Sequence, residues 1–306
     1  MKIGVIGTIV KDHIYLANGK EVRSYGGIYY TLSILGNLLR AEDQIYPVCF
    51  LGKDLYDDVL TRLSQYKNIK TSTIEKITQK NTTVKLLYKN LESRDEFITH
   101  LMPPIEFDHI QKIEGIDIWL INFITGFELS LDTFNKFCEQ GSGIIYVDFH
   151  SLSLDINQKG QRIPRKLPNW GQWIRGIDVL QMNDAEAAIL NESTNLSHEE
   201  LIKFGRDVIK KNIKIFHITR GSKGSLLFYQ DNQGVHDVEF PAKEVDEVID
   251  VTGCGDAFAA GFLVHYCNHK DIIAATRYAN SIAGVNCTVR GTEELYKLKK
   301  FLMKGK

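Results

Sequence analysis

The chain has 306 residues, of which 43% are hydrophobic and 25% are charged, and its formal net charge is −1. This length is enough for a sizeable buried core, and the balanced charge argues against a basic surface for nucleic acid or an anionic membrane. No apolar run approaches the thickness of a bilayer, and the five cysteines include no CxxC pair. We therefore expect a cytoplasmic protein with reduced thiols, whose partners include neither nucleic acid nor membrane.

Apolar, strand-like runs alternate with helical patterns through most of the chain. Strands are expected over residues 2–8, 44–51, 116–122, 143–148, 177–182, 213–219 and 225–230. Helices are expected over residues 27–39, 54–65, 130–140, 184–191, 197–211, 255–267, 270–286 and 292–303. Most of the strand runs are typical of parallel strands that are buried on both faces. The alternation predicts an α/β fold with a central, mostly parallel sheet and helices on both faces.

Residues 9–25 and 81–101 interrupt this alternation. The first segment is short, polar and β-like, and the second alternates between polar and apolar residues, as a hairpin with one solvated face does. The two segments could form a small sheet that projects from a main body made of residues 1–8, 26–80 and 102–306. The other interpretation of residues 81–101 is a simple surface hairpin.

The segment 250–261 contains a glycine pair, Gly253 and Gly255, followed directly by Asp256 and an apolar helix. Glycines let successive backbone N–H groups converge on one point, and a helix N-terminus adds unpaired N–H groups and a positive dipole end. Such a pocket suits a phosphate group. Because a carboxylate at its mouth would repel an anion, Asp256 is better interpreted as the acceptor of a proton from an incoming hydroxyl.

Other interpretations of this segment were weighed against the phosphate pocket. It lacks the Gly-Lys-Ser/Thr of a P-loop, and Phe258 replaces the third glycine of a dinucleotide-binding fingerprint. It could be only a tight turn in which Asp256 caps the helix. The thiol of Cys254 at the helix N-terminus could also act as a nucleophile, although the sequence places no His or Asn partner for it.

The segment resembles the C-terminal signature of the PfkB (ribokinase-like) carbohydrate kinases, through the string Asp250-x-Thr252-Gly253-x-Gly255-Asp256-x-Phe258. The resemblance implies a ribokinase-like fold in which a β-sheet lid, built from residues 9–25 and 81–101, covers the sugar. It also implies that Asp256 is the catalytic base. The N–H groups of Gly253, Cys254, Gly255 and Asp256 would then form the anion hole.

The resemblance extends to the sugar site. Asp12 matches the family acid that accepts hydrogen bonds from sugar hydroxyls, and Gly26-Gly27 matches a glycine pair that lets the chain approach the sugar. The family often has an asparagine a few residues later, where this chain has Tyr30-Thr31. Either this polar contact with the sugar is missing from the chain, or Thr31 or Tyr30 replaces it.

The resemblance also assigns nucleotide contacts. Asn183 and Glu186 match an Asn-x-x-Glu motif in which the acid organises Mg²⁺ and its waters around the ATP phosphates, and on local grounds they are equally a helix cap. Thr219, Gly221 and Gly224 match a motif that contacts the nucleotide, although the glycines alone mark a turn.

Two further matches are weaker. Asp250 and Thr252 resemble positions beside a monovalent cation site, which the loop around 286–291 would complete, and a K⁺ requirement is left open. Asp148-Phe149-His150 stands where relatives carry Asp-x-Asn, so His150 is expected to face the substrate or the nucleotide.

The residues and the resemblance together predict an ATP-dependent phosphotransferase that phosphorylates a hydroxyl of a sugar or sugar-like small molecule. Two alternatives remain. One is a nucleoside or sugar-phosphate kinase of the same family, in which Arg23, Lys85 and Arg94 would supply cations for a phosphate. The other is a non-catalytic sensor that binds a sugar or a nucleotide. An exposed edge of the lid also predicts a homodimer that forms through the lid.

Overall fold

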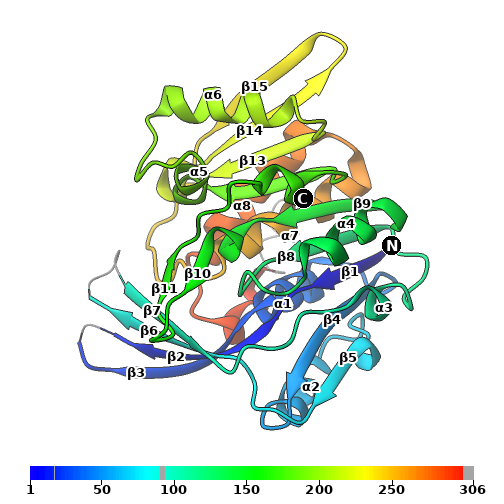
Figure 1. The fold of residues 1–306 in the computed structure, drawn as a ribbon, viewed down its shortest axis with the longest axis vertical. Coiled ribbons are helices and arrows are strands. Elements are labelled where there is room, and N and C mark those ends of the chain that lie inside the picture. The colour runs from blue at the N-terminus through cyan, green and yellow to red at the C-terminus, as the bar shows by residue number, and fades with distance from the viewer. Residues whose placement is uncertain (17, 90–93, 299–306) are drawn as a thin grey trace.

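The computed structural model describes residues 1–16, 18–89 and 94–298. Within these residues the main sheet has nine strands in the order β15-β14-β13-β12-β9-β8-β1-β4-β5 (Figure 1). Their bounds are β1 (Lys2–Ile6), β4 (Gln44–Gly52), β5 (Ile74–Ile77), β8 (Ile118–Asn122), β9 (Ile144–Asp148), β12 (Val179–Asn183), β13 (Ile215–Thr219), β14 (Ser225–Asp231) and β15 (Gly234–Phe240). All neighbours from β5 to β13 are parallel, and β14 and β15 extend the sheet in antiparallel fashion.

Helices cover both faces of this sheet (Figure 1). One face packs against α1 (Ile28–Leu38), α2 (Tyr56–Leu63), α7 (Cys254–His269) and α8 (Ile272–Asn286), and the other against α3 (Phe107–Ile110), α4 (Leu131–Gln140), α5 (Asp184–Leu190) and α6 (His198–Ile209). Strand β8 shows why the central runs are apolar throughout. Ile118 and Leu120 belong to the hydrophobic cluster of one face, whereas Trp119 and Ile121 belong to the cluster of the other.

Helix α7 is the element that fixes the C-terminal motif in space. Its residues 257–263 are all buried, which is typical of a helix surrounded by protein rather than lying at the surface. Small residues let α8 pack closely against it, since a Cβ at Gly261 would lie 3.1 Å from Ile282. The start of α7 is tied to the ends of two main strands by hydrogen bonds from Asn122 and Gln181. The carboxyl ends of parallel strands are where such sheets bind ligands.

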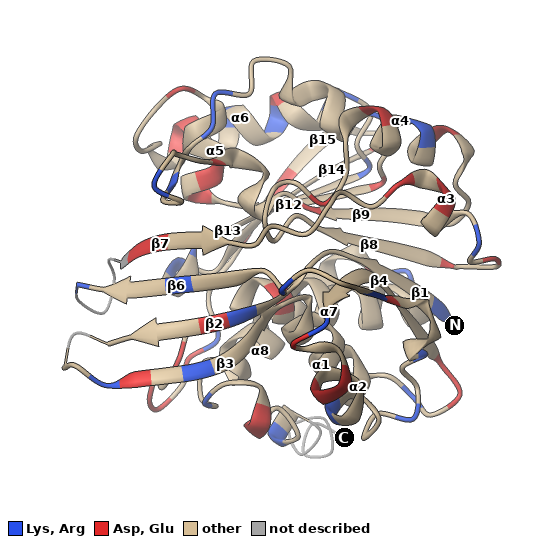
Figure 2. Cartoon of the chain, turned by 60° about the horizontal axis from the view of Figure 1, so that its bottom comes forward, with Lys and Arg blue, Asp and Glu red and all other residues tan. Residues whose placement is uncertain are grey.

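A second, smaller sheet has the order β3-β2-β6-β7, and we call it the lid sheet (Figure 1). Its strands are β2 (Ile9–Tyr15), β3 (Glu21–Gly27), β6 (Thr83–Tyr88) and β7 (Arg94–Thr99). Figure 2 shows acidic and basic residues along these strands. The expected small sheet is confirmed, while the exact domain boundaries stay a prediction. Strand β3 runs to Gly27, so the glycine pair lies within the lid sheet at the point where α1 begins.

A hairpin from the main body meets the lid sheet. It consists of β10 (Leu154–Ile156) and β11 (Arg162–Pro164), which pair in antiparallel fashion. An antiparallel bridge joins Phe97 of β7 to Gln161, and the Ile98 N–H donates to the Gly160 carbonyl at 2.8 Å. The β7 edge of the lid sheet is therefore covered by this hairpin.

Some elements differ from the expectations. The strand expected over 225–230 forms, but it is antiparallel, and β5, β15 and the β10–β11 hairpin are not predicted. Strands β5 and β15 lie at the two edges of the main sheet, where polar residues interrupt the apolar runs, and β10 and β11 form a separate two-stranded sheet. The helix expected over 292–303 is wrong at its start, which is a 3₁₀ turn, Thr292–Glu294. Residues 299–303 of that helix and 90–93 of the expected hairpin lie outside the described residues. None of the helices described is long and apolar enough to cross a bilayer.

Candidate active site

A cavity of about 340 Å³ is lined by the lid sheet, by the carboxyl ends of main strands and by the start of α7. It brings together most of the residues that the sequence assigns to a site. These are Asp12, Gly26, Gly27, Asn183, Glu186, Thr219, Thr252, Gly253, Cys254, Gly255 and Asp256. Thr31, Asp250, Gly221 and Gly224 lie outside the cavity wall.

The carboxylate of Asp256 lies in the first turn of α7 and is held by two donors. The hydroxyl of Thr31 and the amide of Asn122 both donate to its Oδ1 atom, the amide at 2.9 Å. Burial raises the pKa of Asp256 to about 6, and these hydrogen bonds act in the opposite direction. At pH 7 the group is therefore largely ionised and more basic than an ordinary aspartate. These are the properties of a general base that accepts a proton from a hydroxyl.

The glycine turn before Asp256 has the geometry expected of an anion site. Gly253 caps α7 with φ 74°, and a Cβ at this position would lie 2.5 Å from the Tyr30 ring, so only glycine fits. The first N–H groups of a helix have no partner inside it, so the turn offers donors and a positive dipole end to the cavity. The N–H of Cys254 is the least available of these donors, because it points to the Val251 carbonyl at 3.3 Å.

Thr31 is expected to contact the sugar, but its hydroxyl instead contacts the carboxylate of Asp256. Its side chain is fully buried in α1, outside the cavity wall. Thr31 is thus a positioning residue for Asp256 in this structure. Asn122, which shares this role, is not predicted from the sequence, because it is 134 residues away from Asp256. The only signal in the sequence is a polar residue that ends an apolar strand run.

We expect Thr31→Val to move the acidic limb of the pH profile of kcat/KM to higher pH. Valine has nearly the same shape but no hydroxyl to stabilise the ionised carboxylate, so the pKa of Asp256 rises above about 6. Ser33→Ala is the matched control, because Ser33 is equally buried in α1 and its hydroxyl has no hydrogen-bond partner among the described residues. A profile that stays in place for Thr31→Val would contradict this role.

Asn183 and Glu186 both cap a helix and line the cavity. They make a capping box at the start of α5, in which each side chain accepts the other residue's backbone N–H at 2.8 Å. The same two side chains line the cavity. His150 also lines it, and its Nδ1 atom lies 3.9 Å from Oε1 of Glu186.

Two buried acids, Glu186 and Asp148, line this part of the cavity, and carboxylates are suitable ligands for a cation. Burial raises the pKa of Glu186 to about 8. Burial, together with the carboxylates of Glu186 and Asp256, also raises the pKa of Asp148. Within the described residues, no cluster of three or more His, Cys, Asp or Glu could hold a metal ion alone. This donor set fits Mg²⁺, which commonly takes one or two carboxylates and completes its coordination with water and substrate phosphates.

The turn after β13 separates its three predicted residues. Thr219, the last residue of β13, lines the cavity. Gly221 and Gly224 have φ values of 53° and 84° and belong to the turn that connects β13 to β14. A Cβ at Gly224 would lie 2.0 Å from the carbonyl oxygen of Phe240, so this glycine lets two chain segments approach closely. The structure thus gives Gly224 a packing role.

Asp250 and Thr252 belong to a compact loop that is tied to the end of α8. Oδ1 of Asp250 accepts the Thr252 N–H at 2.9 Å, and the Thr252 carbonyl accepts from the Asn286 amide at 2.9 Å. The Asn286 Oδ1 atom is buried and has no hydrogen-bond partner in the part of the chain that is described. Carboxylate, carbonyl and amide oxygens are suitable ligands for a hard cation, so these residues fit the monovalent cation site that the sequence suggests.

Cys254 contacts a second thiol rather than a base. Its Sγ atom lies 3.0 Å from Sγ of Cys287, and the Asn286 amide approaches it at 3.4 Å. The hydrogen bond to Cys287, together with burial, raises the pKa of Cys254 well above its usual range. A thiol that is held protonated is a poor nucleophile, and this argues against the thiol-enzyme interpretation.

We expect Cys254→Ala to keep activity within several-fold of the wild type. The side chain is small, and the proposed role of this position belongs to the backbone turn. Cys49→Ala, a substitution in the core away from the cavity, is the control for general effects of losing a buried thiol. A folded Cys254→Ala protein without activity would support the alternative in which the Cys254 thiol is a nucleophile. Steady-state kinetics and the thermal unfolding midpoint of both variants provide the comparison.

The lid side of the cavity is built around Asp12. Its side chain is only 6% exposed, and a Cβ at Gly26 would lie 2.1 Å from its Oδ2 atom. Gly26 therefore leaves the space that the carboxylate occupies. Gly27 has φ 63° and approaches the Thr8 carbonyl so closely that a Cβ would lie 2.1 Å from its oxygen. Gly26 is thus required by the position of the Asp12 side chain, and Gly27 is required by the backbone path.

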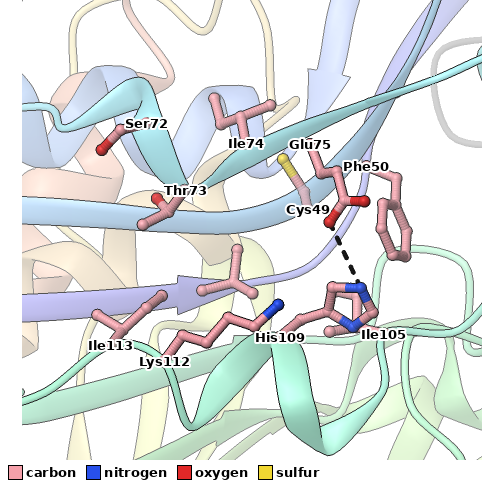
Figure 3. Close-up of a pocket in the computed structure, with 11 residues that line it drawn as sticks. Cys49, Phe50, Ser72, Thr73, Ile74, Glu75, Ile105, His109, Lys112 and Ile113 are labelled. Carbon is pink, nitrogen blue, oxygen red and sulfur yellow. Dashed lines mark ion pairs between the residues drawn. The ribbon is translucent and has the colours of Figure 1, made fainter.

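A second cavity, of about 390 Å³, lies beside β4, β5 and α3 and shares no lining residue with the first (Figure 3). The polar contact drawn there is an ion pair of 3.4 Å between His109 and Glu75. The described residues of this wall include no glycine turn and no helix start with an adjacent acid. The larger volume therefore does not make it the better candidate, and the first cavity remains the candidate active site.

Comparisons with known proteins find related sequences and structures. The model of the pfkB family of carbohydrate kinases matches residues 153–298. A deoxyribokinase of Salmonella typhi is 24% identical over 314 residues, which cover 97% of this chain and 95% of the relative. A ribokinase of Bacillus subtilis is 26% identical over 261 residues, which cover 83% of this chain and 78% of the relative.

Solved structures share the fold. Ribokinase from Giardia lamblia superposes with a TM-score of 0.80 at 16% identity, covering 99% of both chains. A pyrophosphate-dependent kinase in the ribokinase family, complexed with a pyrophosphate analog and myo-inositol, superposes with a TM-score of 0.76 at 18% identity. That alignment covers 98% of this chain and 100% of the other.

Proposed function

Because the chain belongs to the pfkB family of carbohydrate kinases, we propose that the cavity transfers a phosphoryl group from ATP to a hydroxyl of a sugar-like acceptor, with Asp256 as the base. The family and its ribokinase-like fold with a small lid sheet agree with the expectations from the sequence. A kinase that phosphorylates an alcohol group of a sugar or nucleoside follows from the family. The donor and the roles of individual residues are the proposal.

The observation that carries the mechanism is the position of Asp256 at the mouth of the glycine turn. The acceptor hydroxyl gives its proton to the Asp256 carboxylate while its oxygen attacks the γ-phosphorus of the donor, and the bond from phosphorus to the leaving oxygen breaks. The N–H groups of residues 253–256 hold the oxygens of the transferred group. In phosphoryl transfer, positioning and electrostatic stabilisation supply most of the rate. Hydrogen bonds from Thr31 and Asn122 hold the Asp256 carboxylate in its orientation.

A nucleotide is favoured over pyrophosphate by apolar surface next to the glycine turn. Val248, Ile249 and Val251 are 58%, 41% and 58% exposed, and they flank Asp250 at the start of the motif. Exposed aliphatic side chains gathered in one segment indicate a binding surface. A nucleoside has an apolar face to place there, whereas pyrophosphate has none.

Glu186 and Asn183 would hold Mg²⁺ on the donor side of the cavity, Glu186 through water. The bound ion would neutralise phosphate charge and polarise the group that is transferred. Thr219, which lines the cavity, would contact the donor phosphates, and Gly221 and Gly224 shape the turn beside it. Asp250 and Thr252 would hold a monovalent cation that stabilises the loop before α7.

On the other side of the cavity, Asp12 would accept hydrogen bonds from acceptor hydroxyls, beside the backbone of Gly26 and Gly27. A homodimer that forms through the lid is part of the same proposal. Strand β3 is the open edge of the described lid sheet, because the hairpin covers the β7 edge. Light scattering of the purified protein, compared with a variant carrying a proline in β3, would test this dimer.

The donor assay separates the proposal from its competitors. Purified protein is supplied with Mg²⁺ and either ATP or pyrophosphate, with an acceptor panel, and release of ADP or phosphate is followed with and without K⁺. We expect acceptor-dependent ADP release from ATP and none from pyrophosphate. Turnover with pyrophosphate alone would overturn the donor assignment. Binding of ATP without turnover for any acceptor would favour the sensor.

A further inference from the structure

The inner face of the lid sheet is defined by strand alternation. Val10 and Asp12 of β2, Val84 and Leu86 of β6, and Glu96 of β7 line the cavity. The register confirms that they share one face, since Asp12 pairs with Val84, and Leu86 pairs with Glu96. The acceptor side of the cavity thus carries two carboxylates on an aliphatic surface.

Arg162 of the β10–β11 hairpin completes this wall. The antiparallel bridge between Phe97 and Gln161 puts Arg162 next to Glu96 across the two segments, and both residues line the cavity. The Arg162 guanidinium donates to the carbonyls of Thr125 and Ile124, at 2.5 and 2.9 Å. Its Nε atom is buried and has no hydrogen-bond partner among the residues described. The Nε–H donor is therefore left beside the carboxylate of Glu96.

Two acids, Glu96 and Glu128, lie near the positive charge of Arg162. Burial lowers the pKa of Arg162, and the nearby carboxylates of Glu96 and Glu128 act in the opposite direction. Two of its three nitrogens are used by backbone carbonyls. What Arg162 offers to a ligand is one directed N–H donor rather than a free cation.

Arg23 and Lys85, two of the basic lid residues suggested as phosphate contacts, are turned away from the cavity. Lys11 and Arg23 line a separate cavity that shares no residue with the active-site cavity. Lys85 lies with its Nζ atom 4.9 Å from the centre of the Tyr15 ring. Arg23 also pairs with Glu21 at 3.0 Å. The side chain of Arg94 lies outside what the structure describes.

We propose that Glu96 and Arg162 are specificity residues that bind the acceptor beyond its reacting hydroxyl, and that they select an acceptor without a phosphate or carboxylate group. This assignment rests on the proposed kinase function. It narrows the substrate to an uncharged polyhydroxylated molecule, such as an unphosphorylated sugar, polyol or nucleoside. Asp12 and Glu96 accept hydroxyl hydrogens, and Nε of Arg162 donates to a hydroxyl or ring oxygen.

Electrostatics supports this choice over a sugar phosphate. A phosphate on the acceptor would enter a wall with two carboxylates, and it would lose water without gaining a free cation from the part of this wall that the structure describes. Hydroxyl groups, by contrast, satisfy a carboxylate and an N–H donor together. The cavity therefore binds an uncharged acceptor in preference to a sugar phosphate, because the phosphate group would be poorly solvated there.

Binding of matched acceptor pairs tests the proposal without relying on turnover. Isothermal titration calorimetry of the full chain compares a sugar with its terminal phosphate and with its sugar acid, in the absence of donor. We expect the neutral member to bind and both anions to bind more weakly, by roughly ten-fold or more. Tighter binding of the phosphate or the acid would overturn the proposal. Binding of the neutral member without any phosphoryl transfer would instead contradict the proposed kinase mechanism, and the acceptor preference would stand.

Variants at Glu96 test the residue itself. Glu96→Gln should raise the acceptor KM by roughly ten- to a hundred-fold and leave the donor KM unchanged, because only the acceptor loses a charged hydrogen-bond partner. Glu96→Lys should shift binding toward the phosphorylated member of a pair. Asp95→Asn is the matched control, because Asp95 is the neighbouring acid on β7 and pairs with Lys89 outside the cavity wall. Equal effects on acceptor and donor KM, or an effect of Asp95→Asn as large as that of Glu96→Gln, would refute the assignment.

Arg162 needs a variant that keeps the hairpin in place. Arg162→Lys retains the charge and removes the directed Nε donor, so it should raise the acceptor KM while the thermal unfolding midpoint stays near that of the wild type. Arg165→Lys is the control, since Arg165 anchors the same hairpin to the Gly126 carbonyl at 3.1 Å without lining the cavity. If both variants change the kinetics equally, the effect belongs to the hairpin, and the role of Arg162 is refuted.

Discussion

Asp256→Asn is expected to slow phosphoryl transfer by roughly 10²- to 10⁴-fold while the protein stays folded. The asparagine keeps the shape of the side chain and an oxygen that can accept from Asn122, but it cannot take a proton from the acceptor hydroxyl. Binding of donor and acceptor should therefore persist. The loss should appear in kcat, measured with a coupled ADP assay.

The stability of this variant distinguishes a lost base from a damaged fold. Burial raises the pKa of Asp256 to about 6, so the folded protein holds this proton more tightly than the unfolded chain does. The stabilisation that results is present at low pH and is lost as the pH rises through about 6. Asparagine never ionises, so at pH 8 the free energy of unfolding of Asp256→Asn should not be lower than that of the wild type.

An acid in a comparable place serves as the control for this experiment. Asp132 also lies in the first turn of a helix, α4, but it is exposed and outside the cavity. Asp132→Asn should leave kcat unchanged. Near wild-type turnover by Asp256→Asn would remove Asp256 from the role of base, whatever its effect on stability.

Gly255→Ala is expected to reduce kcat/KM by on the order of 10²-fold without a loss of stability. The only heavy atom recorded near a Cβ at this position is Nε2 of Gln181, at 3.7 Å, which is an ordinary contact. The chain can therefore accept the methyl group, and alanine is a better helix former than glycine. Because Gly255 lines the cavity, the methyl group would occupy space where a phosphoryl oxygen is proposed to lie.

Two other glycines show which part of this effect is structural. Gly253→Ala should lose both activity and stability, because Gly253 has φ 74° and its Cβ would lie 2.5 Å from the Tyr30 ring. Gly171→Ala should change neither, since no atom lies within 4 Å of its Cβ and it is outside the cavity. A fully active Gly255→Ala protein would contradict the anion hole.

The fold was predictable wherever a local pattern determines the structure. The apolar runs of β8 and β9 predict buried parallel strands because both of their faces are covered by helices. Strand β15 was missed because its residues are mostly half-buried, at the edge of the sheet, and lack a continuous apolar run. The antiparallel direction of β14 depends on the short turn after β13, which periodicity does not reveal.

The candidate site was predictable where its chemistry is contiguous in the chain. The motif around Gly253 and Asp256 can be recognised because helix start, glycine pair and acid are neighbours in sequence. Asn122 and Arg162 could not be recognised, because each is brought to the cavity by a separate element. Thr31 was assigned to the substrate for the same reason, since only the packing of α1 against α7 reveals its contact with Asp256.

The central claim is that Asp256 activates a hydroxyl for attack on a nucleotide phosphate. Its most direct test is to incubate wild type and Asp256→Asn with Mg²⁺, ATP and a panel of neutral sugars, polyols and nucleosides, and to identify products by mass spectrometry. The account predicts one phosphorylated acceptor for each ADP formed by the wild type, and almost none from the variant. No phosphorylated product from any acceptor, or equal product from both proteins, would contradict it.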